Sequence, residues 1–245
     1  MPPFKIDLTM EEYLAFLISS EVRGDEITCV GTLSPVPLMG SLLSKMTRAK
    51  SAKLMVFGGE EQPLVDGSKE LFDLAQRGKL GLMFLSGAQI DQKGNINLTC
   101  IGDYASPKVR LPGGAGSAML YYMAKRTVLF SLAHSLRVFV ENLDFTTSVA
   151  DDDSPWRLGR LTKVITPLCV FTYNPDRKYL EVESIHPGVS PKEVVENTGF
   201  PTNPEGCPES PEPAEEDISL LRNEVLSETA KVYPQFVKKL RKNIT

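Results

Sequence analysis

The stretch "SKELFDLAQRGKLGLMFLSG", residues 68–87, decides the fold of this chain. Its first half has the pattern of an amphipathic helix that Ser68 caps and Gly78 ends, and its second half is a continuous apolar run. A strand that is apolar on both faces is typical of a parallel sheet covered by helices on both sides. The stretch therefore predicts one helix–strand unit of an α/β fold.

The same alternation precedes this stretch. Thr9 and Glu12 form a capping box at the start of a helix, and a second helical segment spans residues 37–50. Apolar runs at residues 26–33 and 52–59 follow these two helices in turn. Three consecutive helix–strand units predict an α/β fold with an open, mostly parallel sheet and helices on both faces.

Further elements are predicted in the second half of the chain. Apolar runs predict strands within residues 127–134, 137–142, 163–173 and 178–186, and Asn174-Pro175-Asp176 supplies a hairpin turn before the last run. Ser190 and Glu193 start a short helix that ends at Gly199. His186 precedes this helix in "HPGVSP", and we interpret it as structural, although a role as a base is the alternative.

Composition divides the chain into three parts. Residues 1–200 form a single α/β domain, residues 201–217 are a Pro- and Glu-rich linker that should be extended, and residues 218–245 are a C-terminal helical segment.

Composition also excludes several classes of function. The net charge is -4 and acidic and basic residues are interspersed, so no basic stripe for nucleic acid is expected. The four cysteines are widely separated and only two histidines could join them, so no metal site is expected. No signal peptide pattern and no membrane-spanning apolar stretch is found. We therefore expect a cytoplasmic protein with reduced thiols.

A glycine- and amide-rich stretch, residues 86–118, is the candidate for a functional site. Gly113-Gly114-Ala115-Gly116 precedes an apolar helical run, so free N–H groups at a helix start would favour an oxyanion or a phosphate. The dinucleotide pattern G-x-G-x-x-G is not met there. A tight turn with close helix packing is the structural alternative for the glycines, and bonds to the backbone are the alternative for Asn95 and Asn97.

The order of motifs in this stretch resembles the β subunit of class I CoA-transferases of the glutaconate CoA-transferase type. The motifs are "SGAQID" (86–91), "GNIN" (94–97), "IGDYASPKVR" (101–110) and "GGAGSA" (113–118). The resemblance extends over nearly the full chain and includes residues 29–40, 137–148 and 164–200. It implies an open α/β sheet, assembly with a larger α subunit into a tetramer of two α and two β chains, and an acyl-CoA thioester as substrate. No permanently bound cofactor is implied.

The resemblance also assigns roles to the glycine and amide residues. An oxyanion loop would be formed by Gly113, Gly114, Ala115 and Gly116, because backbone N–H donors stabilise the charge that develops on a thioester oxygen. Positioning of the acyl group or of CoA is assigned to Gly87, Ala88, Gln89, Asn95 and Asn97.

The chain departs from the family at the nucleophile. Transferases of this class attack the thioester with a glutamate at the end of a strand, in a motif like "V-E-S-G". Ungapped alignment with "LMVFGGEE" puts Phe57 at that glutamate and Gly59 at the motif's glycine. Both residues are therefore expected to bind substrate, and the Phe57 ring is expected to line an apolar acyl pocket. Glu60 follows and is the remaining candidate for a catalytic carboxylate, with a solvated loop acid as the alternative.

Three functions follow from this departure. The pattern at Gly59 to Gln62 and "SIHPGVSP" (184–191) most resemble a bacterial steroid-degradation β subunit, whose enzyme opens a ring by hydrolysis with a glutamate of the α subunit. Hydrolytic carbon–carbon cleavage or related non-transfer chemistry is therefore the leading interpretation. A genuine CoA-transferase that uses Glu60 is the first alternative, and a non-catalytic subunit that completes the CoA site is the second. A decarboxylase branch with cysteine at the nucleophile position is disfavoured by Phe57.

Overall fold

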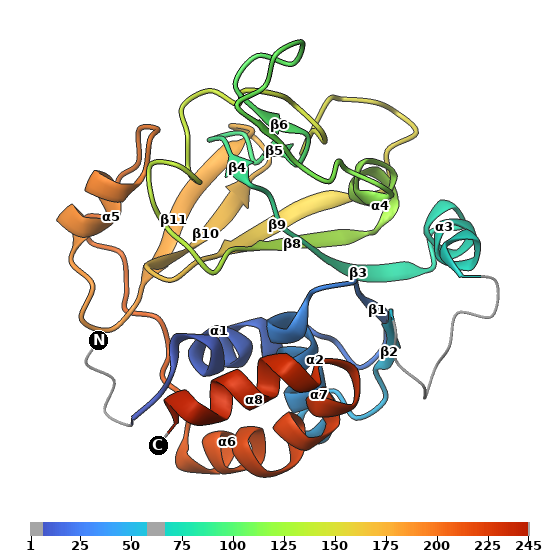
Figure 1. Cartoon of the computed structure of the whole chain (residues 1–245), viewed down its shortest axis with the longest axis vertical. Helices are drawn as coiled ribbons and strands as arrows, with labels where there is room; N and C mark the ends of the chain where they lie inside the picture. The colour runs from blue at the N-terminus through green and yellow to red at the C-terminus, as the bar shows by residue number, and fades with distance from the viewer. Residues whose placement is uncertain (1–6, 58–66, 245) are drawn as a thin grey trace.

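A seven-stranded sheet forms the centre of the computed structural model, which describes residues 7–57 and 67–244 (Figure 1). In spatial order its strands are β11 (Tyr179–Ile185), β10 (Cys169–Asn174), β9 (Arg160–Ile165), β8 (Arg126–Phe130), β3 (Leu80–Leu85), β1 (Ile27–Val30) and β2 (Lys53–Val56). The five strands from β9 to β2 are parallel, and β10 and β11 are antiparallel to their neighbours. The predicted open, mostly parallel sheet is confirmed.

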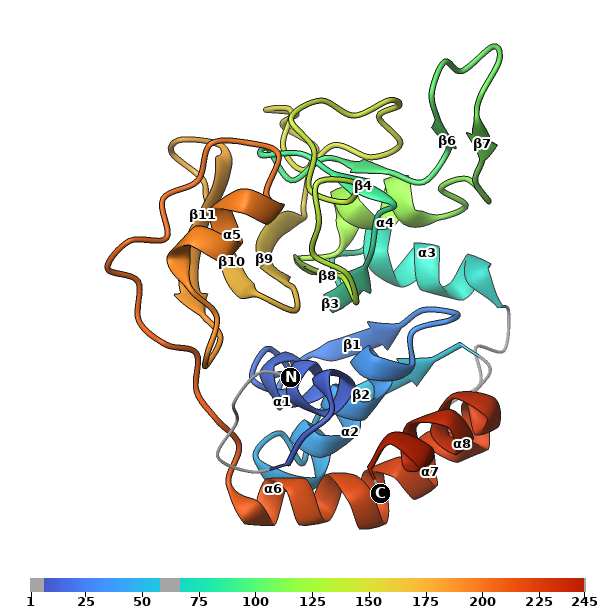
Figure 2. The same ribbon diagram turned by 60° about the vertical axis from the view of Figure 1, so that its left-hand side comes forward.

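Helices cover both faces of the sheet (Figures 1 and 2). One face carries α1 (Met10–Ser19), α2 (Pro35–Thr47), α6 (Glu215–Leu220), the π-helical turn η1 (Leu221–Val225), α7 (Leu226–Val232) and α8 (Pro234–Asn243). The other face carries α3 (Ser68–Gln76), α4 (Ser117–Met123), α5 (Pro191–Asn197) and two small sheets, β4 (Gln89–Ile90) with β5 (Ile96–Asn97) and β6 (Cys100–Ile101) with β7 (Val109–Arg110). Within the described ranges, no helix is both long enough and apolar enough to cross a bilayer.

Strand β3 shows why the sequence of a central strand is apolar throughout. Leu82 and Phe84 pack into the core beneath α1, α2 and the C-terminal helices, and Met83 and Leu85 pack into the core beneath α3 and α4. Successive side chains of a strand point to opposite faces, so both sets are buried.

Most predicted helix starts agree with the structure. Thr9 Oγ1 accepts from the Glu12 N–H (3.2 Å), and Glu12 Oε2 accepts from the Thr9 N–H (2.9 Å), which confirms the capping box. Ser190 caps α5 as predicted. The predicted cap at Ser68 is wrong, because Ser68 is the first helical residue and Gly67 holds the cap position.

Two predicted strands differ from the structure. The run at residues 137–142 is a loop with one isolated bridge between Phe139 and Ile90, and its apolar character reflects burial of Phe139 in the core. The run at residues 163–173 is two strands, because Thr166 forms a turn in which its Oγ1 accepts from the Cys169 N–H (3.1 Å).

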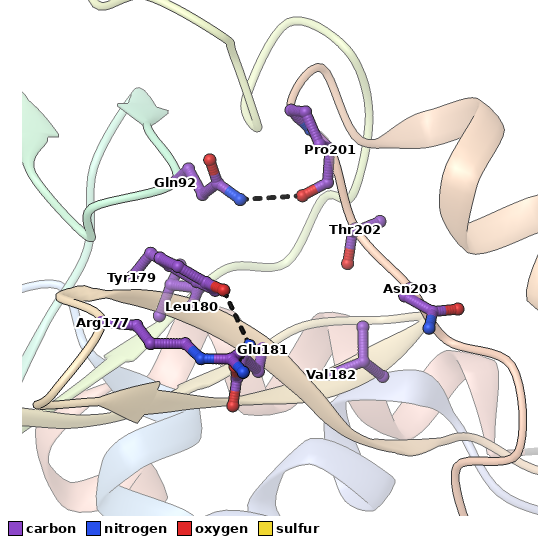
Figure 3. A pocket seen from close by; sticks show the side chains of 9 residues that line it. All are labelled: Gln92, Arg177, Tyr179, Leu180, Glu181, Val182, Pro201, Thr202 and Asn203. Carbon is purple, nitrogen blue, oxygen red and sulfur yellow. Dashed lines mark hydrogen bonds and ion pairs between the residues drawn. The ribbon is translucent and has the colours of Figure 1, made fainter.

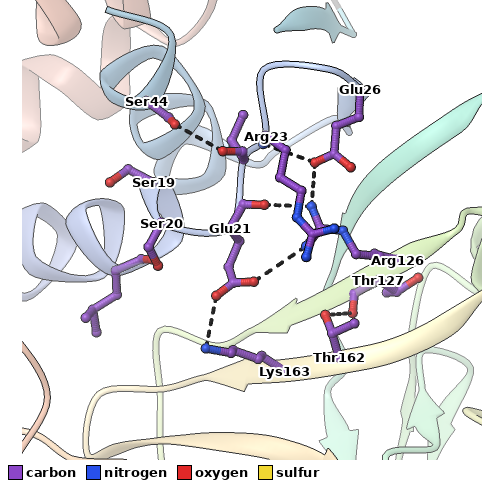
Figure 4. Close-up of polar contacts among 12 residues, drawn as sticks. Ser19, Ser20, Glu21, Arg23, Glu26, Ser44, Arg126, Thr127, Thr162 and Lys163 are labelled. Atoms are coloured by element: carbon purple, nitrogen blue, oxygen red, sulfur yellow. Dashed lines mark hydrogen bonds and ion pairs between the residues drawn. The ribbon is translucent and has the colours of Figure 1, made fainter. Parts of the chain in front are cut away.

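An ion-pair cluster fastens the end of α1 to the sheet (Figure 4). Glu21 lies 3.6 Å from Arg126 Nη1 on β8 and 3.2 Å from Lys163 Nζ on β9. Arg126 also pairs with Glu26, and Lys163 lies 2.7 Å from Glu183 on β11. These charges satisfy one another at the amino end of β8, far from its carboxyl end.

A buried histidine joins β11 to the segment that precedes α6. His186 is fully buried, and its Nε2 donates to the Thr166 carbonyl (2.6 Å), so its Nδ1 accepts from Ser210 Oγ (2.9 Å). Ser210 Oγ lies 2.7 Å from Ser184 Oγ, and the Tyr13 ring packs edge-on against the imidazole. These contacts give His186 the structural role that the sequence predicted.

The burial of His186 predicts a loss of stability in mild acid. Burial lowers its pKa to about 4 from the value of 6.5 expected in the unfolded chain. The stabilisation is complete above pH 6.5 and falls as the pH drops from 6.5 toward 4, because only the unfolded chain binds the proton in that window. We expect a decrease of about 1.4 kcal/mol in the free energy of unfolding per pH unit from this group. Urea denaturation across that range measures it.

The matched control is His186→Gln, which keeps polar contacts but cannot be protonated. Its free energy of unfolding should be lower at neutral pH and should vary less with pH. A variant with the same pH dependence as the original chain would contradict the prediction.

Candidate active site

Four neighbouring parallel strands end at one edge of the central sheet. The chain leaves β1 at Gly31, β2 at Phe57, β3 at Ser86 and β8 at Ser131, and all four residues line one cleft. From β1 the chain passes outward to β2 and then back across β1 to β3, so the winding direction reverses here. Open α/β sheets place their ligands at such a reversal, outside the carboxyl ends of the strands.

The cleft has a volume of about 740 Å³, within the range of small-molecule sites. Most of its wall is apolar and consists of Leu33, Phe57, Leu71, Phe72, Met83, Phe84, Leu85, Leu98, Leu120, Phe130 and Leu132. Hydroxyl and small residues complete it, namely Thr32, Ser34, Ser68, Ser86, Ser117, Ser131, Gly31, Gly114, Ala115, Gly116 and Ala133.

Phe57 stands directly after β2. Its backbone N–H donates to the Val30 carbonyl (3.1 Å), which continues the pairing of β2 with β1, and its half-buried side chain packs against the core beneath α3 and α4. An aromatic side chain therefore lines the cleft at the strand end where the resemblance expects a carboxylate. Gly59 and Glu60, the other two predicted site residues here, lie outside the described residues.

The loop before α4 lines the cleft with Gly114 and Gly116, which have no side chains. A β-carbon on Gly114 would lie 2.6 Å from Thr147 Cγ2, and one on Gly116 would lie 2.6 Å from the Phe72 ring. Real β-carbons essentially never make contacts under 3.0 Å, so a side chain at either position would force Thr147 or Phe72 to shift.

The N–H groups of this loop have two different environments. The Gly113 N–H donates to the Leu98 carbonyl (2.8 Å) and the Ser117 N–H donates to the Gly114 carbonyl (2.7 Å), which anchors both ends of the loop. Across the described parts of the chain, no acceptor bonds the N–H groups of residues 114–116. Unbonded donors beside a cleft are what an oxyanion requires. Three of the four residues predicted for the oxyanion loop thus line the cleft, and Gly113 anchors it.

Gln89 and Asn97 form a buried polar network next to the cleft. Asn97 Nδ2 donates to Gln89 Oε1 (2.7 Å) and to the Cys100 carbonyl (2.6 Å), and Gln89 Nε2 donates to Asp144 Oδ2 (3.0 Å). Both amides are buried and neither lines the cleft. Any role of these amides in positioning the substrate therefore acts through the protein groups that they hold.

Asn95 is bonded in the same way. Its Nδ2 donates to Asp91 Oδ2 (2.9 Å), and its Oδ1 accepts from the Ala150 N–H (3.0 Å). Burial raises the pKa of the Asp91 carboxyl, and the hydrogen bonds from Asn95 oppose that shift. The bond from the Ala150 N–H is a bond to the backbone, which is the structural alternative that the sequence predicted for Asn95.

Gly87 and Ala88 connect the cleft to this network. A β-carbon on Gly87 would lie 2.7 Å from the Gln89 carbonyl oxygen, and the Ala88 N–H donates to the Asn97 carbonyl (2.9 Å). These two residues follow Ser86, which lines the cleft, so they set the path of the chain where it leaves β3.

Several cleft residues were not predicted from the sequence. Phe72 and Leu98 supply apolar wall, and Ser117 is buried with no hydrogen-bond partner for its Oγ among the described residues. Thr147 Oγ1 accepts from the Leu98 N–H (2.8 Å) and thereby supports the glycine loop. The sequence could have indicated Phe72 as a cleft residue, because Phe72 belongs to the predicted helix that covers β3. It could not have indicated Thr147, because Thr147 contacts residues that are distant in the sequence.

A second hollow of about 510 Å³ lies beside the outer strand β11 (Figure 3). Gln92 Nε2 donates across it to the Pro201 carbonyl (2.8 Å), and Arg177 pairs with Glu181 at 3.1 Å. Its charged groups are paired and it is remote from the strand reversal, so the strand-end cleft is the stronger candidate. No group of three or more His, Cys, Asp or Glu in the described ranges is placed to hold a metal ion.

The chain is similar to known proteins over most of its length. The family model described as Coenzyme A transferase matches residues 14–197. The chain belongs to the coenzyme A transferase family. The resemblance found in the sequence motifs is confirmed.

Three relatives illustrate the range of this coenzyme A transferase family. The chain is 41% identical to the B subunit of 3-oxoadipate CoA-transferase from Pseudomonas knackmussii over 155 residues, which is 60% of this chain and 59% of that relative. It is 26% identical to the B subunit of glutaconate CoA-transferase from Acidaminococcus fermentans, over 89% of this chain and 92% of that relative. It is also 26% identical to the IpdB subunit of the cholesterol ring-cleaving hydrolase from Rhodococcus jostii, over 88% of this chain and 92% of that relative.

Solved structures agree with this coenzyme A transferase assignment. The crystal structure of the Acidaminococcus fermentans glutaconate coenzyme A-transferase superposes with a TM-score of 0.78 at 25% identity, covering 89% of this chain and 95% of that chain.

Substitution of Gly114 in the loop before α4 should lower the activity of the enzyme. Gly114→Val places methyl groups against Thr147 and displaces the unbonded N–H groups, so turnover of a CoA thioester by the assembled enzyme should fall by about 100-fold or more. Steady-state kinetics measure the loss, and light scattering checks that assembly is retained.

Ala118→Val is the control, because it adds methyl groups one turn away at a residue that does not line the cleft. Full activity of Gly114→Val, or an equal loss in both variants, would argue against the oxyanion loop.

Proposed function

We propose that this chain is the β subunit of an enzyme that acts on an acyl-CoA thioester by hydrolytic carbon–carbon cleavage or related non-transfer chemistry. The observation that carries the proposal is Phe57, whose side chain lines the cleft at the strand end where a transferase would present its glutamate. A phenyl ring cannot attack a thioester, so it contributes apolar wall. The similarity to the R. jostii IpdB subunit, which is named as part of a hydrolase, supports this direction.

The glycine loop suits such a cleavage. Water adds to a ketone carbonyl, the adjacent carbon–carbon bond breaks, and its electron pair passes onto the thioester oxygen as an enolate; a proton then reaches the carbon. The unbonded N–H groups of residues 114–116 would donate to that oxygen as its charge develops. The group that activates water comes from outside the described wall, and the family resemblance points to a glutamate of the α subunit.

Exposed leucines at the cleft support a covering α subunit. Leu33 is 87% exposed and Leu132 is 52% exposed, and both line the cleft. Leu136, beyond the end of β8, is 57% exposed. Large apolar side chains grouped on a surface mark interaction sites. An α subunit seated over this edge would bury them and close the cleft.

A CoA-transferase that uses Glu60 is the second candidate. It is favoured by the 41% identity with a relative named for 3-oxoadipate CoA transfer. A transferase accumulates a covalent glutamyl-CoA thioester, whereas the hydrolytic route does not.

Chemical trapping separates the two candidates. The complex with the α subunit is incubated with acyl-CoA and treated with borohydride or hydroxylamine, and peptides of this chain are analysed by mass spectrometry. We expect no modified glutamate. Modification at Glu60 would establish the transferase instead.

Substitution of Phe57 gives a further prediction. Phe57→Leu keeps an apolar side chain and should retain the native rate within about tenfold. Phe57→Glu should lower the native rate by about 100-fold, because a carboxylate replaces apolar wall without groups to orient it. Burial would raise the pKa of the new carboxyl, so transferase or thioester hydrolase activity should be slight at most. Product analysis with both variants tests this, and efficient CoA transfer by Phe57→Glu would contradict it.

A further inference from the structure

The described wall of the strand-end cleft contains no ionisable side chain. Aromatic and aliphatic groups such as Phe57, Phe72, Leu98 and Leu120 form most of it, and its polar side chains are all hydroxyls. Such a wall can pack against hydrocarbon and can bond a neutral oxygen, but it offers no charge to neutralise a carboxylate.

The hydroxyl groups differ in their availability. Ser34 Oγ donates to the Thr32 carbonyl (3.3 Å) and Ser131 Oγ donates to the Ala133 carbonyl (2.7 Å). Ser117 Oγ is buried and has no partner among the described residues. The Ser117 hydroxyl is therefore available to bond an oxygen of a ligand in the cleft.

The charged residue of β8 lies at the end of the strand that is opposite the cleft. Arg126 stands at the amino end of β8, whereas the cleft lies beyond the carboxyl end at Phe130. Arg126 is already paired with Glu21 and Glu26. The unbonded N–H groups of residues 114–116 are assigned above to the reacting oxygen, so they are not available for a distal carboxylate.

We infer that the wall that this chain contributes to the cleft favours acyl-CoA thioesters whose acyl group is apolar and carries no carboxylate. Burial of a carboxylate against the described, uncharged part of the wall loses its hydration without compensation from these residues, which disfavours the acyl groups of dicarboxylic acids. Glutaconate and 3-oxoadipate, the acids in the names of two relatives, are both of that excluded class. The inference rests on the proposed function, because it takes the strand-end cleft as the acyl site.

The test compares two thioesters of equal carbon number. Pentanoyl-CoA ends in a methyl group and glutaryl-CoA ends in a carboxylate, and the affinity of each for the complex with the α subunit is measured by calorimetry. We expect pentanoyl-CoA to bind at least about tenfold more tightly. Equal or tighter binding of glutaryl-CoA would overturn the inference while leaving acyl-CoA recognition intact. Failure of both to bind would overturn the proposed function as well.

A charge-introducing variant then tests this wall itself. Leu98→Arg places a guanidinium at a half-buried position of the cleft and should shift the preference toward glutaryl-CoA by about fivefold or more. Leu74→Arg is the matched control, because Leu74 is also half-buried but does not line the cleft.

The two variants together decide whether the wall sets the preference. A shift confined to Leu98→Arg supports the inference. An unchanged preference in Leu98→Arg, or an equal shift in the control, would overturn it.

Discussion

Five parallel strands with apolar side chains on both faces need cover on both sides of the sheet. This constraint produces two separate cores, one beneath α1, α2 and the C-terminal helices and the other beneath α3, α4 and α5. Because both faces are occupied, the edges at the strand ends are the surfaces left for function. The carboxyl edge is open where the winding reverses, and the cleft forms there.

The cleft combines an apolar wall with a polar support. Gln89, Asn97 and Asp144 bond one another and the backbone behind the chain that leaves β3, and Thr147 supports the glycine loop. Polar side chains therefore fix the position of the backbone, and the backbone and apolar groups face the ligand. This division explains why a region rich in amides surrounds a cleft whose own described side chains carry no charge.

The sequence predicted the order of helices and strands well, and it predicted the side-chain contacts less well. Mostly apolar runs in β1, β2 and β3 identified the parallel sheet, because burial on both faces leaves few polar positions. The run that contains Phe139 also holds three adjacent β-branched or aromatic residues, but it belongs to a loop over the core, which a local pattern cannot distinguish from a strand. In the site, the glycines of residues 113–116 were predictable from their type and order. The contacts that favour glycine at Gly114 and Gly116 come from Thr147 and Phe72, which are distant in sequence, so local spacing could not predict them.

The core beneath α1 and α2 is closed by residues from both ends of the chain. Tyr13 and Leu14 of α1 share it with Leu226 of α7 and Leu240 of α8. During synthesis α1 and α2 emerge long before α7 and α8, so the apolar side chains of α1 and α2 that face the C-terminal helices stay exposed until those helices have been made. The opposite face, whose core uses residues up to Phe200, can be completed earlier. Removal of α7 and α8 would leave the apolar side chains that they cover exposed, and exposed apolar surface of that kind promotes aggregation.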